Sequence, residues 1–161
     1  MQDYAAEYMA LRAANDRMRE TGKAWLWDTI TRICADLNRS IPTPTQPDLI
    51  QIARQEWQFT VEQSTMVGER LGLRYSYRTL LIEVGWPRLP EHGFVPDNGL
   101  ARGRLGFSQN VMLDPRPVAE IILKRGADSQ PVWHLIDNKK LGEILAEPIL
   151  RAYLNLLLKD N

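Results

Sequence analysis

The feature that most constrains the fold is a change of hydrophobic period at Glu56. From there to Val84, apolar and polar residues alternate with period 2, the pattern of strands that bury one face. The alternation returns at Ala101–Phe107, Ala119–Lys124 and Val132–Asp137. These patterns follow one another through short connections with no helical pattern between them. They therefore predict an antiparallel sheet rather than the βαβ units of a parallel one.

Helical patterns lie on both sides of this run. In residues 1–40, one helical stripe carries most of the apolar side chains, namely Tyr4, Tyr8, Leu11, Met18, Leu26, Ile30, Ile33 and Leu37. Asn15 and Gly22 interrupt the stripe, and Gly22 predicts either a break into two helices or a close helix contact. Residues 138–161 predict a second helix, apolar over a broad arc, which is typical of a helix buried on more than one side.

Together these patterns predict one α+β domain over residues 1–161. A long N-terminal helical segment (1–40) leads through a Pro-rich connector (41–47) into a mainly antiparallel sheet of five or six strands (48–137). A C-terminal helix (138–161) packs on the sheet. We also expect a short helix from Asp48 through Arg54. Near Ser76 the pattern fits either a tight turn or one long bent strand, and we expect the turn.

Charge and hydropathy exclude several classes of function. Lys plus Arg and Asp plus Glu both number 20, so the chain lacks the basic excess that non-specific nucleic-acid binding requires. No window approaches the ~18 consecutive apolar residues of a membrane span, and the first residues do not resemble a signal peptide. We therefore expect a cytoplasmic protein that does not bind membranes, and nucleic-acid binding through the arginines of the sheet is a third alternative that the zero net charge disfavours.

The residue types that commonly hold metals or act as nucleophiles are scarce. Cys34 is the single cysteine, so neither an internal disulfide nor a multi-cysteine metal site is possible, and its place beside Ile33 predicts a buried, inert thiol. His92 and His134 lie far apart without metal-ligand spacing. No phosphate-binding loop or nucleophile motif is present, so no metal and no cofactor are predicted.

Arginines of the expected sheet are the main candidates for binding. Alternation places two pairs of arginines, one pair on each of two strands, on the same sheet face. Such guanidiniums either bind carboxylate or phosphate or pair across strands with Glu56, Glu62, Glu69 and Glu83. The loop 85–99, with three prolines and three glycines, adds basic and aromatic side chains. The candidate binding residues are Arg70, Arg74, Arg102, Arg104, Arg88, Trp86 and His92.

The sequence thus predicts a non-catalytic binding or assembly protein. We expect a homodimer formed through the helices, because the N-terminal stripe and the C-terminal helix present more apolar surface than one sheet covers. An anionic small molecule or an acidic segment is the expected ligand of the arginine face. The alternative is an enzyme that acts on a phosphorylated or carboxylated small molecule held by these arginines, with His92 as acid or base.

Overall fold

The computed structural model describes residues 4–42 and 49–159 and has an α+β fold. Seven strands form one antiparallel sheet in sequence order, which confirms the predicted class with more strands than the five or six expected. The strands are β1 (Gln51–Val61), β2 (Ser64–Tyr75), β3 (Arg78–Trp86), β4 (Ala101–Ser108), β5 (Arg116–Arg125), β6 (Pro131–Asp137) and β7 (Lys140–Ile144). The helices are α1 (Tyr4–Ser40) and α2 (Glu147–Leu154), and short 3-10 turns span Pro90–His92, Pro96–Asn98 and Asn155–Leu157.

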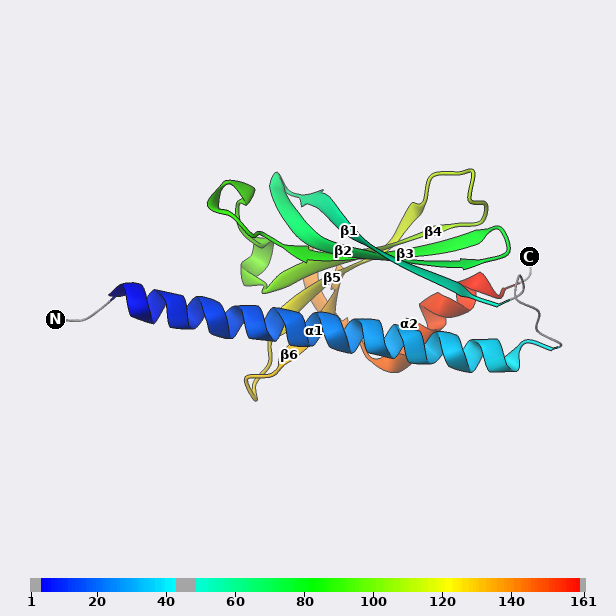
Figure 1. Cartoon of the computed structure of the whole chain (residues 1–161), viewed down its shortest axis with the longest axis horizontal. Helices are drawn as coiled ribbons and strands as arrows, with labels where there is room; N and C mark the ends of the chain where they lie inside the picture. Colours follow the sequence, from blue (N-terminus) through cyan, green and yellow to red (C-terminus); the bar gives the residue numbers. More distant parts are fainter. Residues whose placement is uncertain (1–3, 43–48, 160–161) are drawn as a thin grey trace.

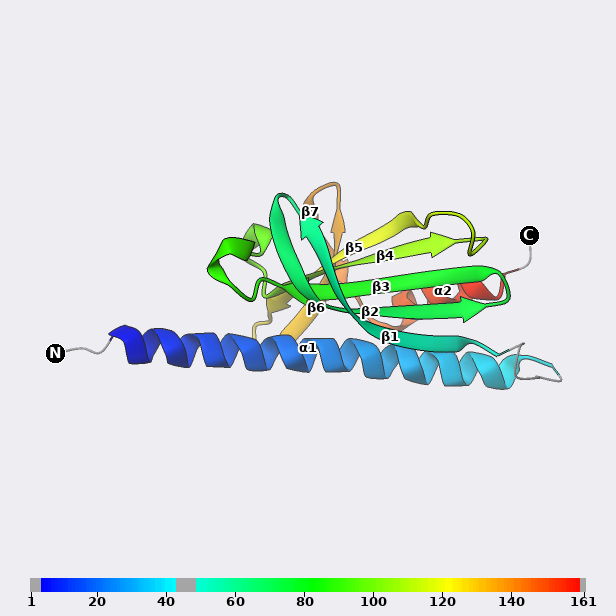
Figure 2. The ribbon, with the colours of Figure 1, turned by 45° about the horizontal axis from the view of Figure 1, so that its top comes forward.

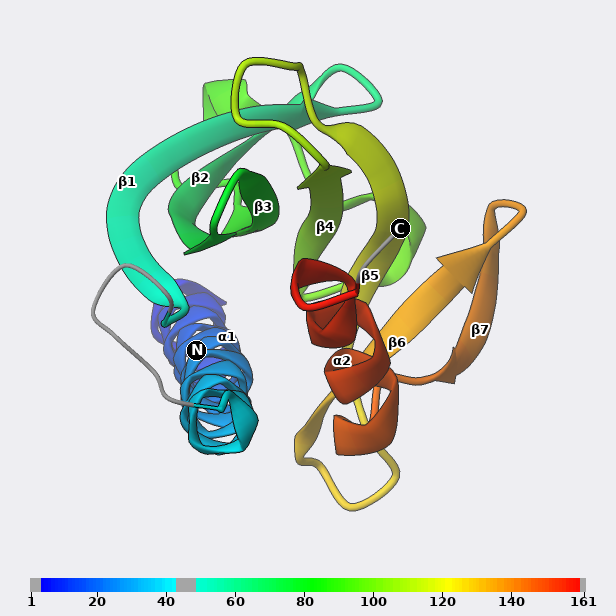
Figure 3. The same ribbon diagram turned by 90° about the vertical axis from the view of Figure 1, so that its right-hand side faces the viewer.

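Both helices lie on the same face of the sheet. α1 runs beneath the strands and continues well beyond them at its N-terminal end (Figures 1 and 2). Seen from the end of the molecule, β1 to β5 form an arch, and α1 and α2 lie side by side at its open side (Figure 3). The core fills this arch. Its fully buried members include Leu26, Ile30 and Ile33 of α1, Leu150 and Leu154 of α2, and Leu73, Leu80, Ile82, Leu105, Ile121 and Leu123 of the sheet.

Gly22 marks a close contact of α1 with the sheet and not a break in the helix. A Cβ atom at this position would lie 2.6 Å from a methyl carbon of Leu123 on β5. The indole Nε1 of Trp133 on β6 donates a hydrogen bond of 2.9 Å to the Gly22 carbonyl oxygen. The second of the two expectations for Gly22 is therefore confirmed, and the glycine lets β5 and β6 approach the helix backbone.

The segment 138–161 is not a single helix as expected. Asn138 and Lys139 both have positive φ and connect β6 to β7 by a two-residue turn, since Asp137 pairs with Lys140. The sequence pattern missed this hairpin, and α2 begins only at Glu147, with Pro148 in its first turn. The helix expected from Asp48 to Arg54 is also wrong, because β1 starts at Gln51; Asp48 and most of the connector 41–47 lie outside the described residues.

The turn at Ser76 is confirmed. Ser76 has φ of 56°, and Tyr75 pairs with Arg78 across the turn. This register turns Arg78 towards the helices, where its Nη1 donates to the Leu157 carbonyl oxygen at 2.9 Å. Arg78 therefore does not join the arginines of the opposite face.

The two helices differ in how far the chain covers them. In the C-terminal region Leu150, Leu154 and Leu157 are fully buried, so the broad apolar arc is enclosed within one copy. In α1 every residue from Tyr4 to Ala13 is exposed. Within residues 4–42 and 49–159, neither helix combines the length and the apolar character of a membrane span.

The contact at Gly22 predicts the effect of adding one methyl group there. Gly22→Ala gains about 1 kcal/mol of helix propensity but overpacks a buried site, which typically costs about 1–3 kcal/mol. We expect a net loss in the free energy of unfolding, measured by urea titration. In a Leu123→Ala background the same change should instead stabilise. A stabilising Gly22→Ala in the otherwise unchanged protein would contradict the close contact.

Cys34 provides a second test of the core. The side chain is 1% exposed, and burial raises the pKa of the thiol to about 12. At pH 8 the native thiol is therefore almost entirely protonated and shielded, and we expect a thiol reagent to modify it only at the rate of unfolding. Labelling of the native protein as fast as in denaturant would show that this part of α1 is not packed.

Candidate functional site

Four arginines occupy the sheet face that points away from the helices. We call Arg70, Arg74, Arg102 and Arg104 the sheet-face arginines. Their register confirms the shared face: Arg70 is paired with Glu83, Glu83 with Arg104, and Arg104 with Glu120. Acidic and basic side chains thus alternate across β2 to β5, an arrangement that stabilises neighbouring strands.

Most sheet-face arginines already have partners. Arg104 forms an ion pair with Glu83. Arg102 is 4% exposed, and its Nη atoms lie 3.6 Å from Glu120 and 4.0 Å from Asp97. Arg70 stacks on Trp57 at 3.7 Å, and the Arg74 Nε donates to the Ser76 carbonyl at 3.1 Å. Of the glutamates expected as partners, Glu83 has this role, while Glu69 points to α1 and pairs with Lys23.

Of the loop residues predicted beside these arginines, Trp86 and Arg88 lie on the opposite side of the sheet, towards α1. Trp86 is buried and faces α1, with its ring centre 3.9 Å from the Arg88 guanidinium carbon and 5.6 Å from the Lys23 ammonium. The Nδ1 atom of His92 accepts hydrogen bonds of 3.1 Å from the backbone N–H groups of Arg88 and Leu89. The predicted patch is therefore divided: Trp86 lies on the opposite face from the sheet-face arginines, and the His92 Nδ1 is engaged by the backbone of its own loop.

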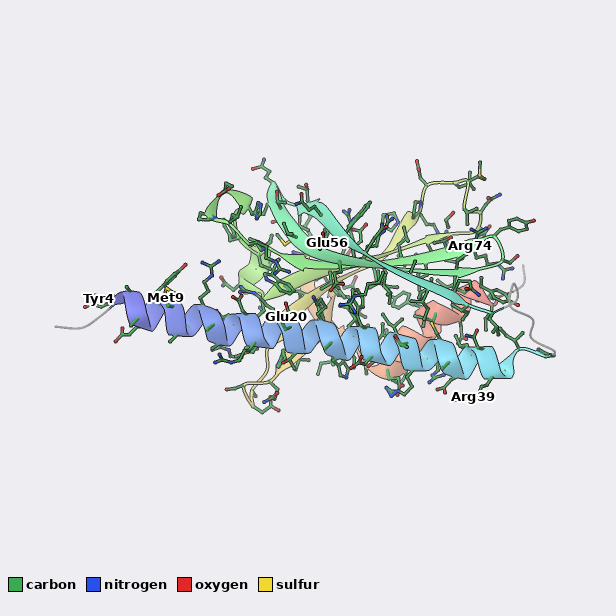
Figure 4. The ribbon with its side chains drawn as sticks, viewed as in Figure 1. Tyr4, Met9, Glu20, Arg39, Glu56 and Arg74 are labelled. Atoms are coloured by element: carbon green, nitrogen blue, oxygen red, sulfur yellow. The ribbon has the colours of Figure 1, made fainter. Side chains whose placement is uncertain are left out.

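A groove lies between the N-terminal half of α1 and the segment 87–100. We call it the α1–loop groove; its volume is about 850 Å³, and Arg125 at the end of β5 completes it. Its apolar lining consists of Tyr8, Leu11, Pro87, Leu89, Pro90, Phe94, Val95 and Leu100. In Figure 4, Tyr4 and Met9 mark the end of α1 that extends past the strands, whereas Arg74 lies towards the other end of the sheet. None of the sheet-face arginines is part of the groove lining, so the two are separate surfaces.

Four further arginines line the groove and are oriented mainly by uncharged acceptors. The Arg12 Nη2 donates to the Arg88 carbonyl at 3.2 Å, and the Arg88 Nε donates to the Val67 carbonyl at 3.1 Å. The Arg125 Nη2 donates to the Asn15 amide oxygen at 2.7 Å. Among the residues that the structure describes, these three guanidiniums have no carboxylate partner in an ion pair.

The fourth arginine, Arg19, anchors the helix to the loop. Its Nε donates to the Leu100 carbonyl at 2.7 Å, and its Nη1 pairs with Asp16 at 2.7 Å. Burial lowers the pKa of Arg88, but a guanidinium remains charged at neutral pH. No aspartate or glutamate is part of the groove lining. The α1–loop groove therefore combines apolar walls with four guanidiniums, of which Arg19 alone has a carboxylate partner in an ion pair among the described residues.

A second hollow, between α1 and the β1–β2 pair, has a different character. Its volume is about 710 Å³ and its lining includes Lys23 and Glu69. Lys23 lies 2.6 Å from Glu69, and Arg54 pairs with the same carboxylate. The Arg54 hydrogen bond, helped by Lys23, lowers the pKa of Glu69 to about 2 against the opposing effect of burial. With the further Lys23–Glu20 pair at 3.2 Å, these ion pairs connect α1 to the sheet and balance the positive charge of this hollow.

Sequence reasoning identified Arg88 but missed Arg12, Arg19 and Arg125. One signal was available: Arg12 and Arg19 are seven residues apart and follow one flank of the Tyr4–Tyr8–Leu11 stripe. Arg125 carried no comparable signal, because its contact with Asn15 joins residues far apart in the chain. In the described part of the chain, no three His, Cys, Asp or Glu side chains gather as metal ligands would.

The groups that line the α1–loop groove are suited to binding. Guanidiniums, apolar side chains and backbone carbonyls form its walls, and its lining contains no histidine, cysteine or carboxylate for general acid–base chemistry. Comparison of the chain with protein-family models, curated proteins and solved structures finds no match. The function is therefore inferred from the geometry of this groove.

Proposed function

We propose that the protein is a non-catalytic binding module. Its α1–loop groove receives a helical segment that carries both apolar and acidic side chains. The observation that supports this proposal is the composition of the groove, in which exposed Leu89 and Phe94 lie close to three arginines without carboxylate partners. This proposal keeps the predicted class of binding or assembly protein but moves the site from the sheet face to α1.

The two properties of the groove together select the ligand. A purely apolar segment would bury guanidiniums without compensating charge, which is strongly unfavourable. A small anion would leave the aromatic and aliphatic walls exposed to water. The binding free energy would then lack the contribution of about 25 cal/mol for each Å² of apolar surface that a larger ligand buries. A segment with acidic residues beside apolar ones satisfies both, since each charge-assisted hydrogen bond contributes about 1.5–3 kcal/mol.

The exposed part of α1 also favours a helical ligand. An amphipathic helix can lay its apolar side chains between the ridges of a second helix, which is a common mode of peptide recognition. Tyr8 and Leu11 offer such ridges, and the loop forms the opposite wall.

The enzyme alternative has less support. It requires the sheet-face arginines to hold an anion near His92, but Arg102 and Arg104 are next to carboxylates on their own sheet. The Nδ1 atom of His92 accepts backbone hydrogen bonds and stabilises a loop turn. We therefore use the sheet-face arginines as the control surface in the test of the groove.

The test is a fluorescence-anisotropy titration with a labelled helical peptide that has leucines at i, i+3 and i+4 spacing and glutamates beside them. We expect the wild-type protein to bind it more tightly than a matched peptide with glutamines. Arg12→Gln combined with Arg125→Gln should weaken binding roughly tenfold or more, because charge-assisted hydrogen bonds are lost. Arg70→Gln combined with Arg74→Gln, which removes the same charge from the sheet face, should leave binding unchanged.

Two outcomes would contradict the proposal. Equal affinity for the glutamate and glutamine peptides would show that the groove does not distinguish a negatively charged ligand from a neutral one. Loss of binding in the sheet-face variant alone would move the site to the face favoured by the enzyme alternative. Thermal unfolding of each variant confirms that the fold is retained.

A further inference from the structure

We infer that the segment bound in the α1–loop groove is the N-terminal half of α1 from a second copy of the chain. This inference rests on the proposed function of the groove and names its partner. The two α1 helices run antiparallel about a twofold axis that passes between Met9 and Ala10. Each copy contributes its exposed helix end to the groove of the other, so the site is complete only in the dimer.

One face of α1 continues from the buried core to the exposed end of the helix. Tyr4, Tyr8, Leu11, Asn15, Met18 and Gly22 follow one another at alternating intervals of four and three residues, the spacing of a coiled-coil seam. We call this row the seam. From Gly22 onward the same face is buried under the sheet, and Met18 is half-buried at its edge. The seam therefore runs out of the core and stays uncovered over Leu11, Tyr8 and Tyr4.

The exposed end of α1 and the facing loop leave a large apolar surface uncovered. Tyr4, Tyr8 and Phe94 are 71%, 64% and 74% exposed, which at the usual area of a buried aromatic amounts to about 400 Å² in each copy. Leu11 and Leu89 add to it. Two copies thus supply most of the ~1,200 Å² at which standard interfaces begin.

The N-terminal end of α1 is helical although no described part of one copy packs over it. All residues from Tyr4 to Ala13 are exposed, although they continue a regular helix. No apolar side chain of this end is buried in one copy, so the end frays more readily than the packed half of the same helix. A second helix packed on this end removes apolar side chains from water and supports the helical conformation, whereas a small ligand would cover only part of it.

Oppositely charged side chains of the two copies come close together in this dimer. In the antiparallel arrangement Tyr8 faces Leu11 of the second copy, and Tyr4 faces its Asn15. Glu7 lies beside the seam on the flank opposite to Arg12, as its helical position requires. In this pairing Glu7 lies level with Arg12 of the other copy, three residues from the Asn15 that holds Arg125 at the groove, and the long Arg125 side chain spans that offset. By symmetry, two Glu7–Arg125 pairs form, one at each end of the interface.

The experiment is sedimentation equilibrium of the full chain over about 1–100 µM, the range in which a standard interface becomes occupied. We expect the wild type to dimerise, and Glu7→Arg or Arg125→Glu to weaken the dimer roughly tenfold or more by placing like charges together. The double variant Glu7→Arg/Arg125→Glu should recover much of the loss. Arg17→Glu changes the charge equally on an exposed residue outside the groove and should have no effect.

A second pair of variants tests the seam. Tyr8→Ser should weaken the dimer, while Tyr77→Ser should not, because Tyr77 is similarly exposed (68%) but lies in the β2–β3 turn. A monomer at roughly 100 µM would overturn the inference. So would a dimer that is unaffected by Tyr8→Ser and by both charge reversals.

The two proposals can fail separately. A monomer that binds the acidic peptide in the groove would keep the binding function and exclude the second copy as the occupant. A dimer that responds to the Glu7 and Arg125 variants, but does not bind the peptide, would keep the dimer and overturn the wider binding function.

Discussion

The structure depends on the close packing of α1 against β5 and β6 at Gly22. The missing side chain lets Leu123 reach the helix surface, and Trp133 donates a buried hydrogen bond to the Gly22 carbonyl. This contact fixes where the 37-residue helix, about 55 Å long, crosses the sheet. Because the crossing lies near the middle of α1, one half of the helix is buried and the other half projects.

The properties of the α1–loop groove follow from that projection. The uncovered half carries Tyr8 and Leu11 past the edge of the sheet, towards the loop between β3 and β4. Arg12 and Arg19 donate to loop carbonyls, and Arg125 donates to Asn15, so these arginines join the two walls of the groove through uncharged acceptors. The sheet-face arginines differ, because alternation across β2 to β5 gives Arg104 a glutamate on each side.

The sequence allowed prediction of features that depend on local period. The change at Glu56 predicted the antiparallel sheet, and the N-terminal stripe predicted the face of α1 that packs on it. The candidate site was less predictable. Trp86 lies on the opposite sheet face from Arg102, because it points to α1 with the other inward-facing residues of β3. The register between β3 and β4 decides which residues share a face, and this register depends on the loop between the two strands. Arg125 and Asn15 meet only through the tertiary fold.

Amide hydrogen exchange tests most directly whether a second copy covers the projecting half of α1. The amides of residues 4–13 should be protected at high protein concentration. They should lose protection on dilution below the dissociation constant of the dimer, because the uncovered helix end opens readily. Residues 26–37, buried within one copy, should remain protected throughout and serve as the internal reference. Exchange of residues 4–13 that is fast at every concentration, or equally slow at every concentration down to the monomer, would contradict the claim.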